Sequence, residues 1–216
     1  MDFSKENISK AKESFMHKDP GDGKRGPFYN KTQSWLFDVE NRELFINAVW
    51  QGYLDASRTF SGIKGTNKSE GAFLNLAVSL QNYFKDSNAE FTHETWCTDF
   101  ITDIKNCYNY EARYGQAQKV INMAFKYLYC CEGAEKHNSK FMDCHMPLDQ
   151  YTLVWFFMEG NPLYQGWSWF DKTTYNRVCD EIKNILKASI LDKELVIWDE
   201  LKDKIIDLKM LNNNKS

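Results

Sequence analysis

Residues 114–128 read YGQAQKVINMAFKYL, and this stretch decides how the chain is interpreted. Its apolar residues recur at spacings of three and four, which is typical of an α-helix. Lys119, Asn122 and Lys126 are spaced i, i+3 and i+7, so they form a polar row along one face of that helix. The row either faces water, as lysines on helices usually do, or lines a pocket. The sequence alone leaves both alternatives open.

The same helical spacing recurs along most of the chain. Only four prolines and eleven glycines occur, and alternating β-branched residues are scarce. Apolar residues spaced for helices occupy 44–53, 73–84, 96–107, 148–158, 175–186 and 196–208. We therefore predict an all-α protein that forms a single compact multi-helix domain over residues 1–216. In that domain a polar N-terminal helix at 4–17 and a C-terminal tail at 211–216 are peripheral.

Turn and cap residues predict where several of these helices begin. The Gly- and Pro-rich segment 19–27 predicts a loop, and a second loop is expected at 132–146. Pro147 suits the first turn of the helix that follows, where its missing N–H costs nothing. Thr173 or Thr174 is placed to cap the long helix after it.

Composition limits the class of protein. Hydrophobic residues make up 43% of the chain and charged residues 26%, which predicts a folded protein. The net charge of −3 gives no global field for nonspecific nucleic-acid binding. No apolar run is long enough to cross a membrane, and the six cysteines suggest reduced thiols. We expect a soluble, cytoplasmic protein without a metal site or cofactor.

A second polar feature follows the 114–128 helix. Residues 145–153 read HMPLDQYTL, which puts Asp149 in the first turn of an apolar helix. The helix dipole stabilises a carboxylate there by about 0.3–1 kcal/mol, and this alone would explain the residue. The functional interpretation is that Asp149 stays ionised and acts as a base or stabilises a developing cation, while Lys119 acts as an amine nucleophile. Such a pair needs a partly desolvated pocket.

A Gly-containing turn, a helix with Lys near its start and a Pro-x-Asp at the head of a later helix resemble the helix-hairpin-helix DNA glycosylases. The spacing from Lys119 to Asp149 and the sequence Met-Pro-Leu-Asp are most similar to the archaeal 8-oxoguanine branch. The resemblance covers residues 114–153. It implies that Lys119 attacks the sugar C1′ as the base leaves, that Asp149 assists, and that backbone amides of the hairpin hold a DNA phosphate. Where the family has Gly-x-Gly in the hairpin, this chain has only Gly115.

Other polar and aromatic residues are candidates for substrate contacts. Gln118 and Asn122 lie beside Lys119 and would order the site. Trp167 and Trp169 lie in an aromatic loop that would stack on a base, or would simply attach that loop to the core. The histidines share neither a helical face nor a ligand spacing, so they predict neither a catalytic triad nor a metal site.

Two functions from different classes follow. The first is a DNA glycosylase with lyase activity on a modified purine, with Lys119 and Asp149 as catalytic residues. The second is a non-catalytic protein on the same helical frame that holds a nucleobase, a nucleotide or a protein partner. The acidic net charge, the missing second glycine and the surplus of aromatic residues favour the second.

Overall fold

The predicted all-α architecture is confirmed. The computed structural model describes residues 1–16, 35–90, 92–164, 166–187 and 190–204. Within these ranges every regular element is a helix, and the only β-type pairing is one isolated bridge between Leu36 and Glu132. None of the helices in this part of the chain is long and apolar enough to cross a membrane.

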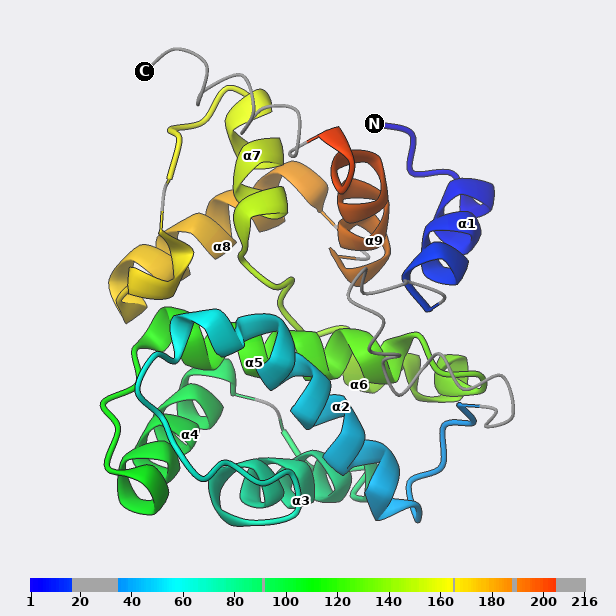
Figure 1. Cartoon of the computed structure of the whole chain (residues 1–216). Coiled ribbons are helices and arrows are strands. Elements are labelled where there is room, and N and C mark those ends of the chain that lie inside the picture. Colours follow the sequence, from blue (N-terminus) through cyan, green and yellow to red (C-terminus); the bar gives the residue numbers. More distant parts are fainter. Residues whose placement is uncertain (17–34, 91, 165, 188–189, 205–216) are drawn as a thin grey trace.

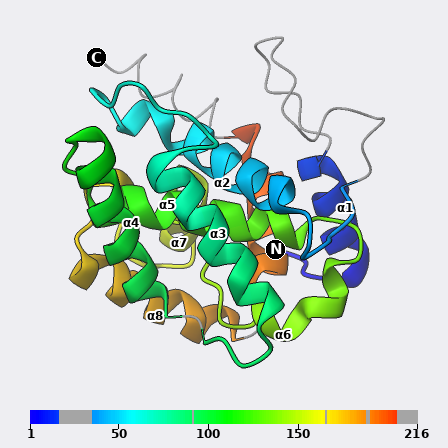
Figure 2. The same ribbon diagram turned by 90° about the horizontal axis from the view of Figure 1, so that it is seen from below.

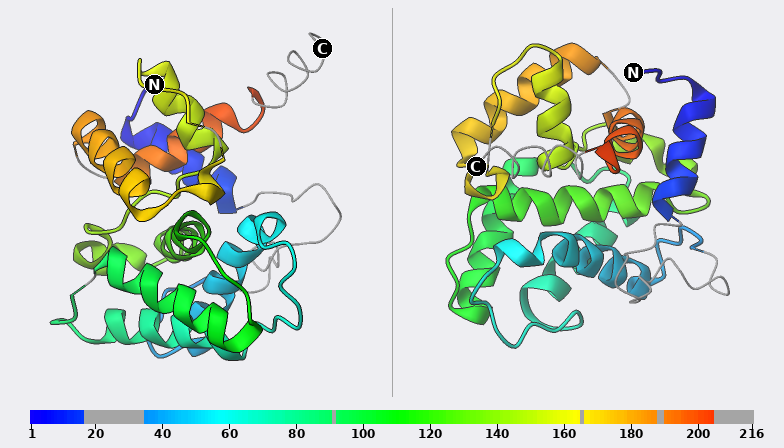
Figure 3. Two further views of the ribbon diagram at one scale, coloured as in Figure 1. Left: turned by 90° about the vertical axis from the view of Figure 1, so that its left-hand side faces the viewer. Right: turned by 45° about the horizontal axis from the view of Figure 1, so that its top comes forward.

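Helix α5 organises the other helices. It runs across the middle of the molecule, with α2, α3 and α4 on one side and α7, α8, α9 and α1 on the other (Figure 1). Figures 2 and 3 show the same arrangement from other sides, and in Figure 3 α1 lies beside α9. The helices are α1 (Lys5–Met16), α2 (Arg42–Ala56), α3 (Gly71–Lys85), α4 (His93–Tyr108), α5 (Tyr114–Tyr129), α6 (Asn138–Phe141), α7 (Gln150–Met158), α8 (Lys172–Leu186) and α9 (Ile190–Leu201).

Because helices cover α5 on both sides, its polar residues are buried as completely as its apolar ones. Lys119, Asn122 and Lys126 are 4%, 0% and 1% exposed. The alternative in which this polar row faces water is therefore wrong. Helix α2 comes especially close to α5, since a Cβ built on Gly52 would lie 2.4 Å from the carbonyl oxygen of Val120. A larger residue at position 52 would push the two helices apart.

Two helix starts differ from the prediction for the same physical reason, the strength of an aspartate cap. Asp149 is the N-cap of α7 rather than a residue of its first turn, and Pro147 precedes the helix. The Asp149 side chain accepts hydrogen bonds from the backbone N–H groups of Tyr151 and Thr152. Helix α8 is capped by Asp171, not by a threonine. A carboxylate at the N-cap also interacts favourably with the helix dipole.

Other predicted boundaries are partly confirmed. The loop expected at 132–146 contains two short helical turns, the 3₁₀ helix η3 (Ala134–His137) and α6. Helix α9 begins before 196, and residues 205–208 lie outside the described residues. The loop at 19–27 and the tail at 211–216 also lie outside them.

Candidate functional site

The two residues singled out as catalytic candidates meet in the structure. The Lys119 Nζ atom lies 2.6 Å from Oδ2 of Asp149, and the two residues are only 4% and 7% exposed. The two oxygens of Asp149 have separate partners, because Oδ1 accepts the capping hydrogen bonds of α7 while Oδ2 binds the lysine. The N-cap therefore fixes the carboxylate in the orientation that faces Lys119.

Electrostatics make this contact an ion pair. Burial on its own would lower the pKa of Lys119, but the Asp149 carboxylate, with a smaller contribution from Asp55, raises it above its ordinary value. Burial would likewise raise the pKa of Asp149, but the Lys119 ammonium and the backbone N–H of Thr152 lower it. At neutral pH the lysine is protonated and the aspartate is ionised.

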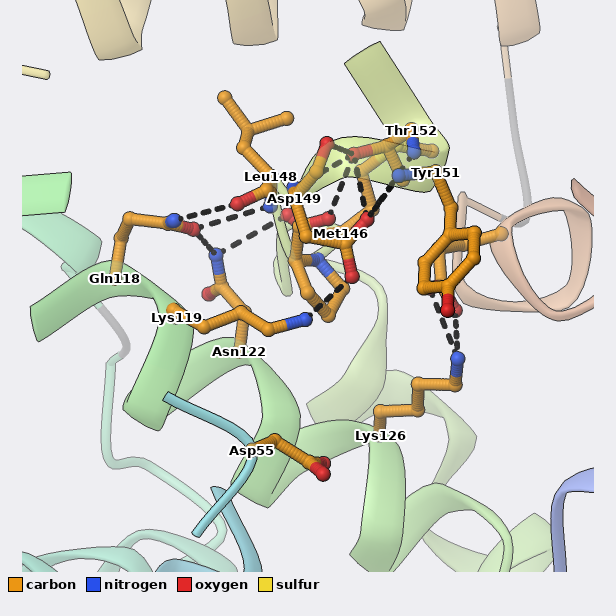
Figure 4. A network of polar contacts seen from close by, with 12 residues as sticks. Asp55, Gln118, Lys119, Asn122, Lys126, Met146, Leu148, Asp149, Tyr151 and Thr152 are labelled. Carbon is orange, nitrogen blue, oxygen red and sulfur yellow. Dashed lines mark hydrogen bonds and ion pairs between the residues drawn. The ribbon is translucent and has the colours of Figure 1, made fainter. Parts of the chain in front are cut away.

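Gln118 and Asn122 hold the segment that carries Asp149 (Figure 4). Gln118 donates from Nε2 to the carbonyl of Leu148 at 3.0 Å and accepts from the Leu148 N–H at 3.2 Å. Asn122 donates from Nδ2 to the carbonyl of Met146 at 3.2 Å and to Gln118 Oε1 at 3.0 Å. Both side chains are completely buried, so their contacts position the ion pair.

The ion pair forms part of the wall of a cavity of about 280 Å³. Helices α1, α2, α5, α7 and α9 and the 3₁₀ helices η2 (Ser57–Thr59) and η4 (Trp167–Trp169) all contribute to it. Its charged lining residues besides the pair are Asp55, Arg58 and Lys126, and its aromatic ones are Phe15, Tyr151, Trp167 and Trp198. A concave site of this size with charged groups and aromatic walls fits a small planar ligand.

A second buried ion pair lies two turns further along α5. Lys126 Nζ lies 2.9 Å and 2.7 Å from the two carboxylate oxygens of Glu194, and both side chains are 1% exposed. Only Oε1 receives an aligned hydrogen bond; Oε2 has none from any described residue. Burial raises the pKa of Glu194, although Lys126 partly offsets this. The Lys126 ammonium also lies 4.2 Å from the ring centre of Phe15 and 5.2 Å from that of Trp198.

The glycine of the predicted hairpin has a packing role. The N–H of Gly115 donates to the carbonyl of Phe170 at 2.9 Å, so it is not free to bind a phosphate. A Cβ at this position would lie 2.0 Å from the carbonyl oxygen of Trp167. Gly115 therefore lets the loop with the two tryptophans pack directly on α5. Within that loop Trp167 lines the cavity, whereas Trp169 is 69% exposed and faces outward.

A histidine cluster was missed because the residues come from distant segments. His93 and His145 stack with ring centres 4.4 Å apart, and the hydroxyl of Tyr175 lies within 3.1 Å of a nitrogen of each. Burial lowers the pKa of His93 to about 4. Asn122 also donates to the Tyr175 hydroxyl, so the cluster is joined to the polar row of α5. Among the described residues, no three His, Cys, Asp or Glu residues are arranged to hold a metal ion.

Sequence reasoning also missed Asp55, Arg58, Glu194 and Trp198 as site residues. Glu194 gives the clearest signal, because it shares one helical face with the apolar residues Leu191, Leu195 and Trp198, at spacings of i, i+3, i+4 and i+7. Comparison of the chain with protein-family models, curated proteins and solved structures finds no match. A function is therefore argued from the geometry of the site.

Proposed function

We propose that the protein is a DNA glycosylase with lyase activity that acts on a modified purine, with Lys119 as nucleophile and Asp149 as its acidic partner. The observation that carries this proposal is the contact of 2.6 Å between the two side chains at the wall of a cavity. The resemblance to helix-hairpin-helix glycosylases rests on the same two residues, which lie thirty positions apart in the sequence. The all-helical fold is compatible with that family.

The pair supplies the groups that the reaction needs. When the bond between C1′ and the purine breaks, the base leaves with the electron pair and takes a proton from the Lys119 ammonium. The neutral amine then bonds to C1′, while the Asp149 carboxylate stabilises the positive charge on the sugar. The C1′–O4′ bond then breaks and O4′ takes a proton from Nζ, which opens the sugar ring and leaves a protonated imine between Lys119 Nζ and C1′, from which the lyase step proceeds.

The rest of the cavity suits an extruded purine. Its volume of about 280 Å³ lies at the small end of ligand sites, as expected for one base rather than a whole nucleotide. Trp167, which is partly exposed, provides aromatic surface on which a base stacks, and the buried Trp198 forms part of the wall behind it.

The test is chemical trapping of the imine. Borohydride reduces it to a stable amine, so incubation with 8-oxoguanine DNA should leave a covalent protein–DNA adduct on a denaturing gel. Lys119→Gln should abolish the adduct, whereas Lys85→Ala, which alters an exposed ion pair with Glu40, should leave it unchanged. Circular dichroism establishes that both variants are folded. The proposal is wrong if no oxidised or alkylated purine substrate gives an adduct that depends on Lys119.

A non-catalytic binding protein is the second candidate, and two observations favour it. Lys119 is held protonated by Asp149, and the Gly115 amide is already bonded to Phe170. A binding protein would use the cavity for a base without forming a bond. It would show saturable thermal stabilisation by free purine bases or nucleotides, because a ligand bound only to the folded state raises Tm by mass action. Such stabilisation without a borohydride adduct would favour this function over catalysis.

A further inference from the structure

A second hollow adjoins the cavity. It has a volume of about 540 Å³ and shares Arg58 and Thr59 with the cavity wall. Its other lining residues include Arg113 at the start of α5 and Trp169 of η4. Arg58 and Thr59 therefore form a wall common to both, so a chain-like ligand that lies in the hollow is next to the cavity. We call this hollow the entrance groove.

Trp169 is presented to solvent in a fixed orientation. The guanidinium carbon of Arg113 lies 3.3 Å from its ring centre and covers one face of the indole. The tryptophan is nevertheless 69% exposed, so its other face remains open. Its backbone is fixed as well, because its N–H donates to Gly166 at 2.8 Å and the next residue, Phe170, binds the Gly115 amide. An exposed aromatic ring held in this way is a stacking surface that loses little entropy on binding.

The charge of the entrance groove is positive. Arg58 is exposed and makes no ion pair with any described residue. The acidic residue of the groove, Glu111, is paired with Lys105 at 2.7 Å, which neutralises it. The planar face of the Arg113 guanidinium stacks on the Trp169 indole, so the N–H groups at the edge of the guanidinium are placed to bind an anion. The groove therefore combines cations with an aromatic ring, as sites for single-stranded nucleic acid do.

We propose that the entrance groove binds the unpaired DNA strand on one side of the extruded nucleotide. The open face of Trp169 stacks on a neighbouring base, and Arg58 and Arg113 bind its phosphates. This inference rests on the proposed function and deepens it, because it gives the two tryptophans different partners. Trp167 faces the base in the cavity, and Trp169 faces a base of the flanking strand. Arg58 and Arg113 also take over the phosphate contact that the Gly115 amide cannot make, because that amide is bonded to Phe170.

The experiment measures binding separately from chemistry. A fluorescein-labelled single strand that contains an abasic-site analogue is titrated with protein, and the Kd is followed by fluorescence anisotropy at several salt concentrations. Trp169→Ala should raise the Kd by roughly 5- to 150-fold, the range measured for loss of one stacked base. Trp169→Phe should recover most of the affinity. Arg58→Ala should reduce the slope of log Kd against log salt by about 0.7, as for one lost phosphate contact.

The control is Leu163→Ala, which removes an exposed apolar side chain from the same inter-helix segment but outside the groove, and its Kd should not change. The inference is overturned if the unaltered protein does not bind the strand, or if Trp169→Ala and Arg58→Ala bind it as the unaltered protein does. Failure of the proposed function looks different. Binding that depends on Trp169 without any borohydride adduct would leave the entrance groove in place and remove the catalytic role of Lys119.

Discussion

The buried pair of Lys126 and Glu194 gives the sharpest test of the energetics of the site. Lys126→Met keeps the length of the side chain but leaves the Glu194 carboxylate without its cation at a position that is 1% exposed. Removing one partner of a buried pair costs about 3–5 kcal/mol. In a chain of this size each kcal/mol lowers Tm by about 2–4 °C, so a decrease of about 6–20 °C is expected. Urea unfolding and thermal unfolding measure both quantities.

Two further variants separate the charge effect from loss of packing. Lys126→Met combined with Glu194→Leu removes both charges, so it should recover most of the lost stability, because apolar residues of similar volume often replace a buried pair at no cost. Lys85→Met is the matched control. Lys85 also lies 2.7 Å from its partner, Glu40, but the side chains are 35% and 74% exposed. Breaking that pair should cost no more than about 1 kcal/mol.

The pH dependence of Lys126→Met provides an internal check. Burial already raises the pKa of Glu194 in the unaltered protein, and loss of the cation raises it further. An acid whose pKa is higher in the folded state favours folding at low pH and loses that contribution as pH rises through the folded pKa. The loss of unfolding free energy in Lys126→Met, relative to the unaltered protein, should therefore grow from acidic to neutral pH. A cost below about 1 kcal/mol at pH 7, or a double variant as unstable as the single one, would refute this reasoning.

Three other perturbations have defined outcomes. Gly115→Ala places a methyl group against the Trp167 carbonyl and should lower the free energy of unfolding, measured in urea, by about 1–3 kcal/mol. It should also weaken the proposed binding of a DNA strand, and unchanged stability would contradict the close packing. The pKa of His93 is lowered to about 4, so its contribution to stability is complete above its unfolded pKa and declines as pH falls below about 6.5. His93→Gln should flatten that part of the stability–pH curve. Asp149→Asn keeps a good N-cap residue but removes the anion, so NMR of the labelled Lys119 ammonium should show a lower pKa.

Local sequence patterns predicted the helices well because the necessary information lies within a few residues. The spacing of apolar residues in α3 and α8 places their buried faces, and Asn161 and Pro162 follow closely after the end of α7. The predicted caps were less accurate. Thr173 and Thr174 are reasonable N-cap residues, but Asp171 just before them provides a stronger acceptor.

The candidate site could be predicted only in part, because it depends on contacts between distant segments. The resemblance to helix-hairpin-helix glycosylases pointed to Lys119 and Asp149 as a pair, yet nothing local to α5 determines whether that face meets water or α7. The partners of Lys126 come from opposite ends of the chain, with Phe15 in α1 and Glu194 in α9. Lysine on an apolar helix is usually solvated, and only the tertiary structure overrides that expectation.

The energetics of α5 give a reason to regard its polar row as functional. Two lysines two turns apart are both buried, each with a carboxylate from a different helix or helix cap. Desolvating four charged groups is expensive, and apolar residues at these positions would hold the same helices together at least as well. The two pairs also line or adjoin one cavity, instead of being scattered through the core. Stability alone therefore does not explain this arrangement, and the proposed function gives it a reason, because fixed, water-excluded charges hold a polar ligand more strongly than solvated ones.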